Sequence, residues 1–160
     1  MRTGLILVFP LLFSCRNAST EATAAPVAKQ PPSAVSAAVT IADACSLISR
    51  SEIEPVFGPL KADPKSGTGL REEKECRYQN LDGQWLETSV FGVERWALEK
   101  GIVSEMHPAP LPNLGDDAFS VKQGTDSVVY IRKGASILET SCSCDMQKTT
   151  AIASKAIGKM

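Results

Sequence analysis

The C-terminal half of the chain carries the strongest constraint on the fold, a series of short strand-like segments joined by tight turns. Residues 118–121, 127–132 and 135–142 are rich in β-branched and aromatic side chains, which is typical of strands. Gly124 lies between the first two segments and Gly134 between the last two. Since connections this short join antiparallel strands, this half of the chain is predicted to form an antiparallel meander.

A hairpin is predicted upstream of the meander. Residues 75–80 and 84–93 alternate in polarity on either side of Leu81-Asp82-Gly83, and an Asp-Gly pair is a strong turn signal. Apolar side chains occur on both faces of the second strand: Trp85, Phe91 and Val93 on one face, Leu86 and Val90 on the other. We therefore expect this strand to be covered on both sides.

Helical patterns flank and separate these strands. Asp43 can cap a first short helix, and Ser51 with Glu54 has the pattern of a capping box for a second one, residues 52–57. Residues 94–106 predict a longer helix. Its apolar side chains at fourfold spacing are Leu98, Ile102 and Met106.

The C-terminal segment predicts a helix that lies across the sheet. Asp145 can cap its start, and several side chains follow a 3.6-residue period: Thr149, Ile152, Ala153, Ala156 and Ile157. The elements therefore follow the order helix, strands, helix, strands, helix. This order predicts an α+β domain with a single antiparallel sheet of about five to six strands and with helices packed on a face.

Residues 1–14 predict a signal peptide. Arg2 precedes an apolar run of about ten residues, which is too short to span a membrane. The sequence Leu12-Phe13-Ser14-Cys15 at the end of this run resembles the lipobox of bacterial lipoproteins. The resemblance implies cleavage before Cys15, acylation of that cysteine and firm anchoring at a membrane. The alternative is an ordinary signal peptidase cut near Ala22-Thr23-Ala24.

Arg16 bears on which membrane would carry the anchored protein. In lipoproteins with a lipobox, this position is a sorting signal, and an aspartate there typically retains the protein in the inner membrane. By the same resemblance, Arg16 implies an exported, lipid-anchored protein on the periplasmic face of the outer membrane.

The rest of the chain divides into a tether and one folded domain. Residues 15–40 begin with Cys15 and consist mainly of Ala, Ser, Thr and Pro, so they cannot bury enough apolar surface to fold. Residues 41–160 are long enough for a single α+β domain with its own core. The net charge of −1 provides no positive field that would attract nucleic acid, so we expect no nucleic-acid partner.

The cysteine count agrees with the lipobox. The chain has five cysteines, an odd number for an exported protein, and the assignment of Cys15 to lipid leaves an even set: Cys45, Cys76, Cys142 and Cys144. Four cysteines allow two disulfides in three connectivities. An oxidising envelope favours pairing of all four.

Short motifs in the domain carry a second resemblance. They are Asp43-Ala44-Cys45-Ser46-Leu47-Ile48, Ser51-Glu52-Ile53, Val56-Phe57-Gly58 and Leu114-Gly115-Asp116-Asp117-Ala118. The set resembles a group of small bacterial lipoproteins of unknown function that are best known from actinobacteria. The resemblance implies that Cys45, on the first helix, forms a disulfide with Cys76, on the first long strand.

Cys142 and Cys144 have two interpretations. In a continuing strand their Cα atoms are about 6.6 Å apart, near the upper limit for a disulfide, so a bridge requires the chain to bend toward Asp145. The alternative is a pair of thiolates that hold a soft cation such as Cu(I), with Met146 or His107 as a further ligand. Because the compartment is oxidising, we predict a structural Cys142–Cys144 disulfide with no bound metal.

The sequence contains no recognisable catalytic constellation. His107 is its only histidine, and no Ser-His-Asp, His-Glu-x-x-His or paired-carboxylate pattern occurs. We therefore expect a non-catalytic envelope lipoprotein, without a cofactor, that binds a partner protein, a lipid or a cell-wall component. The alternatives are a thiol-based copper or redox protein that uses Cys142 and Cys144, and a purely structural envelope protein.

Overall fold

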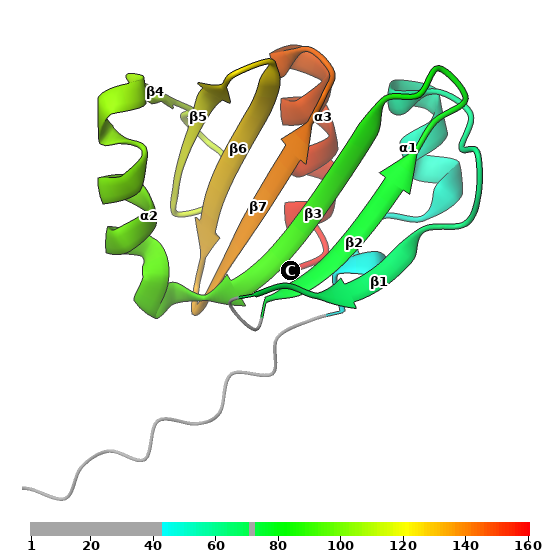
Figure 1. Cartoon of the computed structure of the whole chain (residues 1–160). Coiled ribbons are helices and arrows are strands. Elements are labelled where there is room, and N and C mark those ends of the chain that lie inside the picture. Colours follow the sequence, from blue (N-terminus) through cyan, green and yellow to red (C-terminus); the bar gives the residue numbers. More distant parts are fainter. Residues whose placement is uncertain (1–42, 71–72) are drawn as a thin grey trace, which may run out of the picture. The chain divides into compact units, whose positions relative to one another are not determined.

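The computed structural model describes residues 43–70 and 73–160 of the chain. The predicted signal peptide, the lipidated Cys15 and the tether of residues 15–40 lie outside this part. Figure 1 shows the helices and strands of the described part, in which no helix is long and apolar enough to cross a membrane. In chain order they are η1 (a 3-10 helix, Ala44–Ser46), α1 (Arg50–Phe57), β1 (Lys65–Thr68), β2 (Lys74–Gln79), β3 (Trp85–Gly92), η2 (Val93–Arg95), α2 (Trp96–Ile102), η3 (Ser104–Met106), β4 (Ala109–Pro110), β5 (Asp117–Gln123), β6 (Asp126–Lys133), β7 (Ser136–Cys142) and α3 (Met146–Ile157).

The strands form one antiparallel sheet of seven strands, in the order β1-β2-β3-β7-β6-β5-β4. One half of the sheet consists of β1 to β3 and the other half of β4 to β7. The two halves join where β3 pairs with β7, with Leu86 opposite Cys142. Gly124 and Gly134 lie in the predicted turns of the meander with positive φ angles of 63° and 58°, a conformation that glycine adopts without strain. The prediction of an α+β domain with one antiparallel sheet is therefore confirmed.

The predicted number of strands, five to six, is too low. The edge strands β1 and β4 are short, and all of their residues are exposed. Neither strand therefore shows the alternation of buried and exposed positions that reveals a strand in a sequence. Pro110 lies within β4 and removes a backbone donor from this edge, which disfavours pairing with a strand of another chain.

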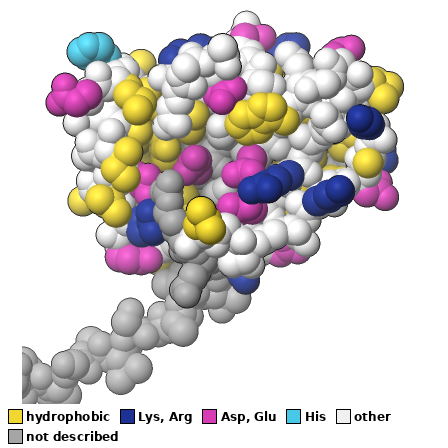
Figure 2. Space-filling view, in the orientation of Figure 1, with side chains coloured by type: hydrophobic (Ala, Val, Ile, Leu, Met, Phe, Trp, Pro, Cys, Tyr) yellow, Lys and Arg dark blue, Asp and Glu magenta, His cyan; other side chains and the backbone are white. Residues whose placement is uncertain are grey.

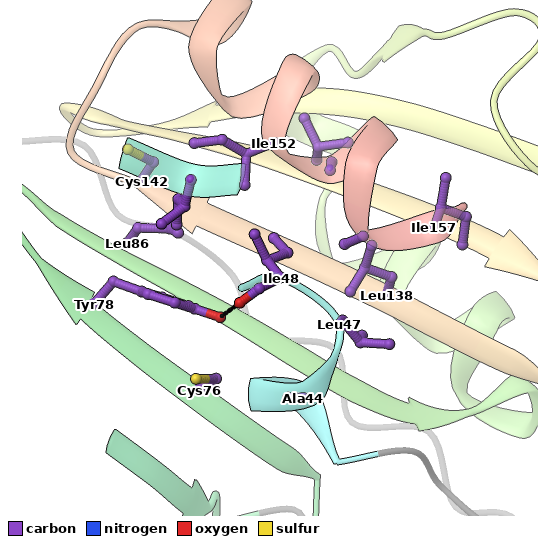
Figure 3. Close-up of a cluster of buried hydrophobic side chains, with 14 of the residues drawn as sticks. Ala44, Leu47, Ile48, Cys76, Tyr78, Leu86, Leu138, Cys142, Ile152 and Ile157 are labelled. Atoms are coloured by element: carbon purple, nitrogen blue, oxygen red, sulfur yellow. Dashed lines mark hydrogen bonds between the residues drawn. The ribbon is translucent and has the colours of Figure 1, made fainter. Parts of the chain in front are cut away.

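Helix α3 packs on one face of the sheet, which we call the back face. The Asp145 side chain accepts a hydrogen bond of 2.8 Å from the Lys148 N–H and so caps the helix. The apolar stripe predicted for this helix is confirmed, because all of its members are buried: Thr149, Ile152, Ala153, Ala156 and Ile157. Figure 3 shows Ile152 and Ile157 directed at the sheet, where Leu138 of β7 belongs to the same core.

The segment that follows η1 completes the back-face core. Leu47 and Ile48 are buried there beside Tyr78 of β2. The Tyr78 hydroxyl donates a hydrogen bond of 3.4 Å to the Ile48 carbonyl (Figure 3). Burial disfavours the phenolate and raises the pKa of Tyr78 to about 12.

Helix α1 begins at Arg50, two residues before the predicted start, because a different serine caps it. The Ser49 N–H donates a hydrogen bond of 2.8 Å to the Glu52 carboxylate, which is the backbone half of a capping box. Glu52 also accepts a hydrogen bond of 2.6 Å from Lys159, just after α3. The bonds from Lys159 and Ser49 lower the pKa of Glu52 from 4.5 to about 2.

Helix α2 lies on the opposite face, which we call the front face, beside β5 and β6. The Trp96 ring is 5.3 Å from the Phe119 ring, and Phe119 is 4.9 Å from Tyr130. Val103 is buried in the same cluster. Helices therefore lie on both faces of the sheet. The prediction that the helices pack on one face is correct for α1 and α3 and wrong for α2.

The side chains that the fourfold spacing predicts to face the core lie instead on the outer side of α2 and η3. Leu98, Ile102 and Met106 are 56%, 52% and 44% exposed, so the interpretation of this spacing as a buried face is wrong. Glu99 is buried instead, with its carboxylate 2.8 Å from the Arg95 guanidinium. The helix turns its other side inward because aromatic rings on β5 and β6 provide the packing partner for Trp96.

Candidate binding groove beside Trp85

In the part of the chain that the structure describes, no helix packs on the front face over β1, β2 and the Trp85 end of β3. At the other end of β3, Arg95 of η2 lies over the Phe91 ring on this face. The side chains of Glu75, Arg77 and Gln79 point to this face, because the alternating positions of β2, Cys76 and Tyr78, are buried in the back-face core. Figure 2 shows acidic and basic side chains next to each other on the face toward the viewer. This polar region is the starting point for a candidate site.

Arg77 is the central cation of the region. Its Nε lies 2.5 Å from the Glu87 carboxylate and its Nη2 lies 3.0 Å from the Glu75 carboxylate. The pKa of Arg77 is raised, mainly by its hydrogen bond to Glu87. Burial, reinforced by the nearby charge of Glu87, raises the pKa of Glu75 despite the opposing charge of Arg77. Arg77 therefore already has two carboxylate partners.

An open groove of about 550 Å³ lies beside Arg77, along the outer side of β2. The Lys61 N–H donates a hydrogen bond of 2.8 Å to the Gln79 carbonyl, which holds the segment before β1 against β2. The groove is lined by Lys61, Ala62, Asp63, Lys65, Arg77, Tyr78, Gln79 and Trp85. It is within the size range of small-molecule sites in proteins.

Trp85 provides an aromatic wall of the groove and is 40% exposed. The backbone N–H of Trp85 donates a hydrogen bond of 2.9 Å to the Ser143 hydroxyl, and the Trp85 backbone carbonyl accepts one of 3.1 Å from the Ser143 N–H. The sheet register places it opposite Gln79. The prediction that this strand is covered on both sides is therefore correct at the buried Phe91 and wrong at Trp85.

Two lysines leave the groove with an excess of positive charge. Lys61 and Lys65 are exposed and, within residues 43–70 and 73–160, neither forms an ion pair. The carboxylate of Asp63, in the same lining, is 2.9 Å from the Arg50 guanidinium and is thus already neutralised. The excess is local, since the whole chain has a net charge of −1.

Both predicted disulfides are present. Cys45 is bonded to Cys76 with the Cα atoms 4.9 Å apart, and Cys142 to Cys144 with the Cα atoms 5.1 Å apart. The second distance is shorter than that of a continuing strand because β7 ends at Cys142 and the chain bends toward Asp145. The sulfur of Cys144 is buried beside the Thr149 hydroxyl, 3.4 Å away.

The residues of the predicted alternative metal site are not brought together. Cys142 and Cys144 are joined to each other, so neither sulfur is a thiolate in this state. Met146 follows them and is half-buried against the back-face core, whereas His107 is exposed in the link between α2 and β4. No group of three or more His, Cys, Asp or Glu side chains in the described residues is arranged to hold a metal ion.

The groove residues Lys61, Lys65, Arg77 and Trp85 are not among the site residues that the sequence predicts. A partial signal exists in the hairpin, because the register across the Asp-Gly turn places Arg77 and Trp85 on one face. The sequence contains no comparable signal for the lysines, since Lys61 precedes and Lys65 begins an edge strand that has no apolar alternation.

Comparisons with known proteins do not assign a family. No family model matches the chain, and no curated protein matches it. Among solved structures, a GTP-binding regulator from Thermotoga maritima matches with a TM-score of 0.45 and 13% sequence identity, over 71% of this chain and 90% of that chain. Similarity at this level establishes neither a shared fold nor a shared function.

Proposed function

We propose that the protein is a non-catalytic binding module of the cell envelope that binds its partner in the groove beside Trp85. Acyl chains on Cys15 hold it at a membrane, on the periplasmic face of the outer membrane. The partner is a cell-wall component, a protein or a lipid exposed in that compartment. No cofactor takes part in binding.

The observation that carries this proposal is an exposed tryptophan on the sheet beside Lys61 and Lys65, which form no ion pair within residues 43–70 and 73–160. A side chain of this size and apolarity is normally withdrawn from water, and here Ser143 and the strand register keep Trp85 at the rim of a groove. The two disulfides support an oxidising compartment, because such bonds persist mainly in exported proteins.

The groove chemistry favours binding over catalysis. Its acid Asp63 and its cation Arg77 are each held in ion pairs, so neither is poised to exchange a proton with a substrate. The single histidine of the chain, His107, lies beyond α2 and does not line the groove. These charges are suited to holding a partner in place.

Affinity capture from the native envelope tests the proposal. The lipidated full chain, a Trp85→Ala variant and a Leu98→Ala variant are each used as bait, and bound molecules are identified by mass spectrometry. Leu98 is the matched control, because it is also an exposed apolar residue but lies on α2. We expect the same partner with the unmodified chain and Leu98→Ala, and its loss with Trp85→Ala. Equal capture by all three baits would refute binding in the groove.

A further inference from the structure

We propose that the ligand of the groove is an anionic glycan, whose sugar ring stacks on Trp85 and whose carboxylate or phosphate groups pair with Lys61 and Lys65. This inference rests on the proposed function, because it names the class of molecule that the same groove binds.

Trp85 provides the surface for a sugar ring. One side of a pyranose ring presents several C–H groups, and these pack well against the electron-rich face of an indole. Because the backbone of Trp85 is fixed through Ser143 and the pairing of β3 with β2, little backbone entropy is lost when a ring docks on it. Gln79, opposite Trp85, adds an amide that can both donate to and accept from sugar hydroxyls.

The charge of the groove indicates an acidic ligand. Lys61 and Lys65 line it without an ion pair among the described residues, so each ammonium group can bind an anion without first breaking an internal contact. Arg77 is different, because separation from Glu75 and Glu87 would leave those carboxylates unpaired. The two lysines are therefore expected to give most of the charge-dependent affinity.

Other anionic ligands fit the groove less well. An acyl chain needs an enclosed apolar channel, whereas this groove is open and is lined largely by charged and polar side chains. Nucleic acid binds to extended basic surfaces, and the chain has 17 basic against 18 acidic residues. An acidic peptide can satisfy the lysines but has no ring that would use the indole face, so it serves as the competing outcome in the test.

The test measures binding of defined oligosaccharides to the full chain in mild detergent, by titration calorimetry and by tryptophan fluorescence. Trp96→Phe leaves Trp85 as the sole indole, because the chain has two tryptophans. If Trp96→Phe fails to fold, calorimetry on the unmodified chain still measures the affinities. The probes are oligogalacturonate, a phosphorylated oligomannose, neutral chitohexaose and an oligoglutamate.

We expect the carboxylated or the phosphorylated glycan to bind at least tenfold more tightly than chitohexaose and to change the Trp85 emission. The affinity should fall as salt is added, because the lysines are exposed. Lys61→Gln with Lys65→Gln should weaken binding at least tenfold, and Trp85→Ala should abolish it. The matched control, Lys148→Gln with Lys155→Gln, removes the same charge from α3 and should leave the affinity unchanged.

Two results would overturn the glycan assignment. If oligoglutamate binds as tightly as either anionic glycan and depends on the same lysines, the ligand is an acidic peptide and the groove remains the binding site. If neither anionic glycan binds better than chitohexaose, the ligand class is wrong. Failure of the proposed function is recognised separately, by capture of the native partner that does not depend on Trp85.

Discussion

Removal of the Cys45–Cys76 disulfide should destabilise the domain far more than removal of the Cys142–Cys144 disulfide. The two bonds differ mainly in the length of chain that they close, with sequence separations of 31 and 2 residues. Closing a longer loop removes more conformational freedom from the unfolded chain. The two double variants are Cys45→Ala with Cys76→Ala, and Cys142→Ala with Cys144→Ala.

The expected magnitudes follow from loop-closure entropy. A separation of 31 residues corresponds to about 3 to 4 kcal/mol at 25 °C, and a separation of 2 residues to about 1 kcal/mol in the same expression. Each double variant also removes two sulfur atoms from buried or half-buried positions, so this contribution largely cancels in the comparison. The difference between the variants should be about 2 to 3 kcal/mol.

Urea unfolding of the full chain, purified without reductant and followed by circular dichroism, measures the two free energies. For the 118 residues from Asp43 to Met160, a loss of about 3 to 4 kcal/mol also corresponds to a fall in Tm of roughly 12 to 16 °C. A difference below about 1 kcal/mol, or a larger loss for the Cys142 and Cys144 pair, would show that loop closure does not govern the stability provided by these bonds.

Three further predictions concern the leader, a carboxylate and the core. Intact-mass analysis should find an acyl increment on Cys15 at the mature N-terminus, and Cys15→Ala should release or misprocess the protein; an unmodified N-terminus beyond residue 22 would contradict the lipid anchor. Since the pKa of Glu52 is lowered from 4.5 to about 2, its bonds stabilise the folded state fully above pH 4.5, and this contribution is lost as the pH falls toward 2. Urea unfolding should therefore show Glu52→Gln less stable than the unmodified chain at pH 7, with most of this gap closed at pH 2, and an unchanged gap would be the contrary result. Ile152→Ala should cost about 2 to 5 kcal/mol, whereas Leu98→Ala should change the free energy of unfolding by no more than about 0.5 kcal/mol; similar losses for both would mean that the exposed side of α2 is buried.

The fold class was accessible from the sequence because the central elements carry their own pattern. The hairpin of β2 and β3 alternates in polarity, and the stripe of α3 follows a 3.6-residue period. The strands of the meander, β5 to β7, are rich in β-branched and aromatic residues and are separated by tight turns. The edge strands could not be found in this way. Residues 65–68 are all exposed, so their strand conformation depends on pairing with β2, which no local pattern specifies.

The orientation of α2 also depends on tertiary contacts. Leu98, Ile102 and Met106 make a regular apolar stripe, and Trp96 with Val103 makes another on the opposite side. Periodicity alone does not determine which of the two stripes faces the sheet. The aromatic cluster on β5 and β6 selects the second one, and this choice is invisible until the strands are placed side by side.

The candidate site was missed for a related reason. Alternation places Trp85 on the front face of β3, but whether that face is covered depends on how far α2 extends across the sheet. Because α2 stops over β5 and β6, Trp85 stays exposed. Lys65 becomes a neighbour of Trp85 through the pairing of β1, the strand without a sequence pattern, with β2, and Lys61 through the bond from its N–H to the Gln79 carbonyl.

The Cys45–Cys76 disulfide has a mechanical consequence for a domain held by its N-terminal side. A pull on the chain before Asp43 reaches Cys45, within the three-residue η1, after two residues and passes through the covalent bond into β2. Since β2 is hydrogen-bonded to β1 on one side and β3 on the other, the load must shear two ladders at once before the sheet opens. Tension applied from the N-terminal side therefore enters an interior strand of the sheet, not an edge strand.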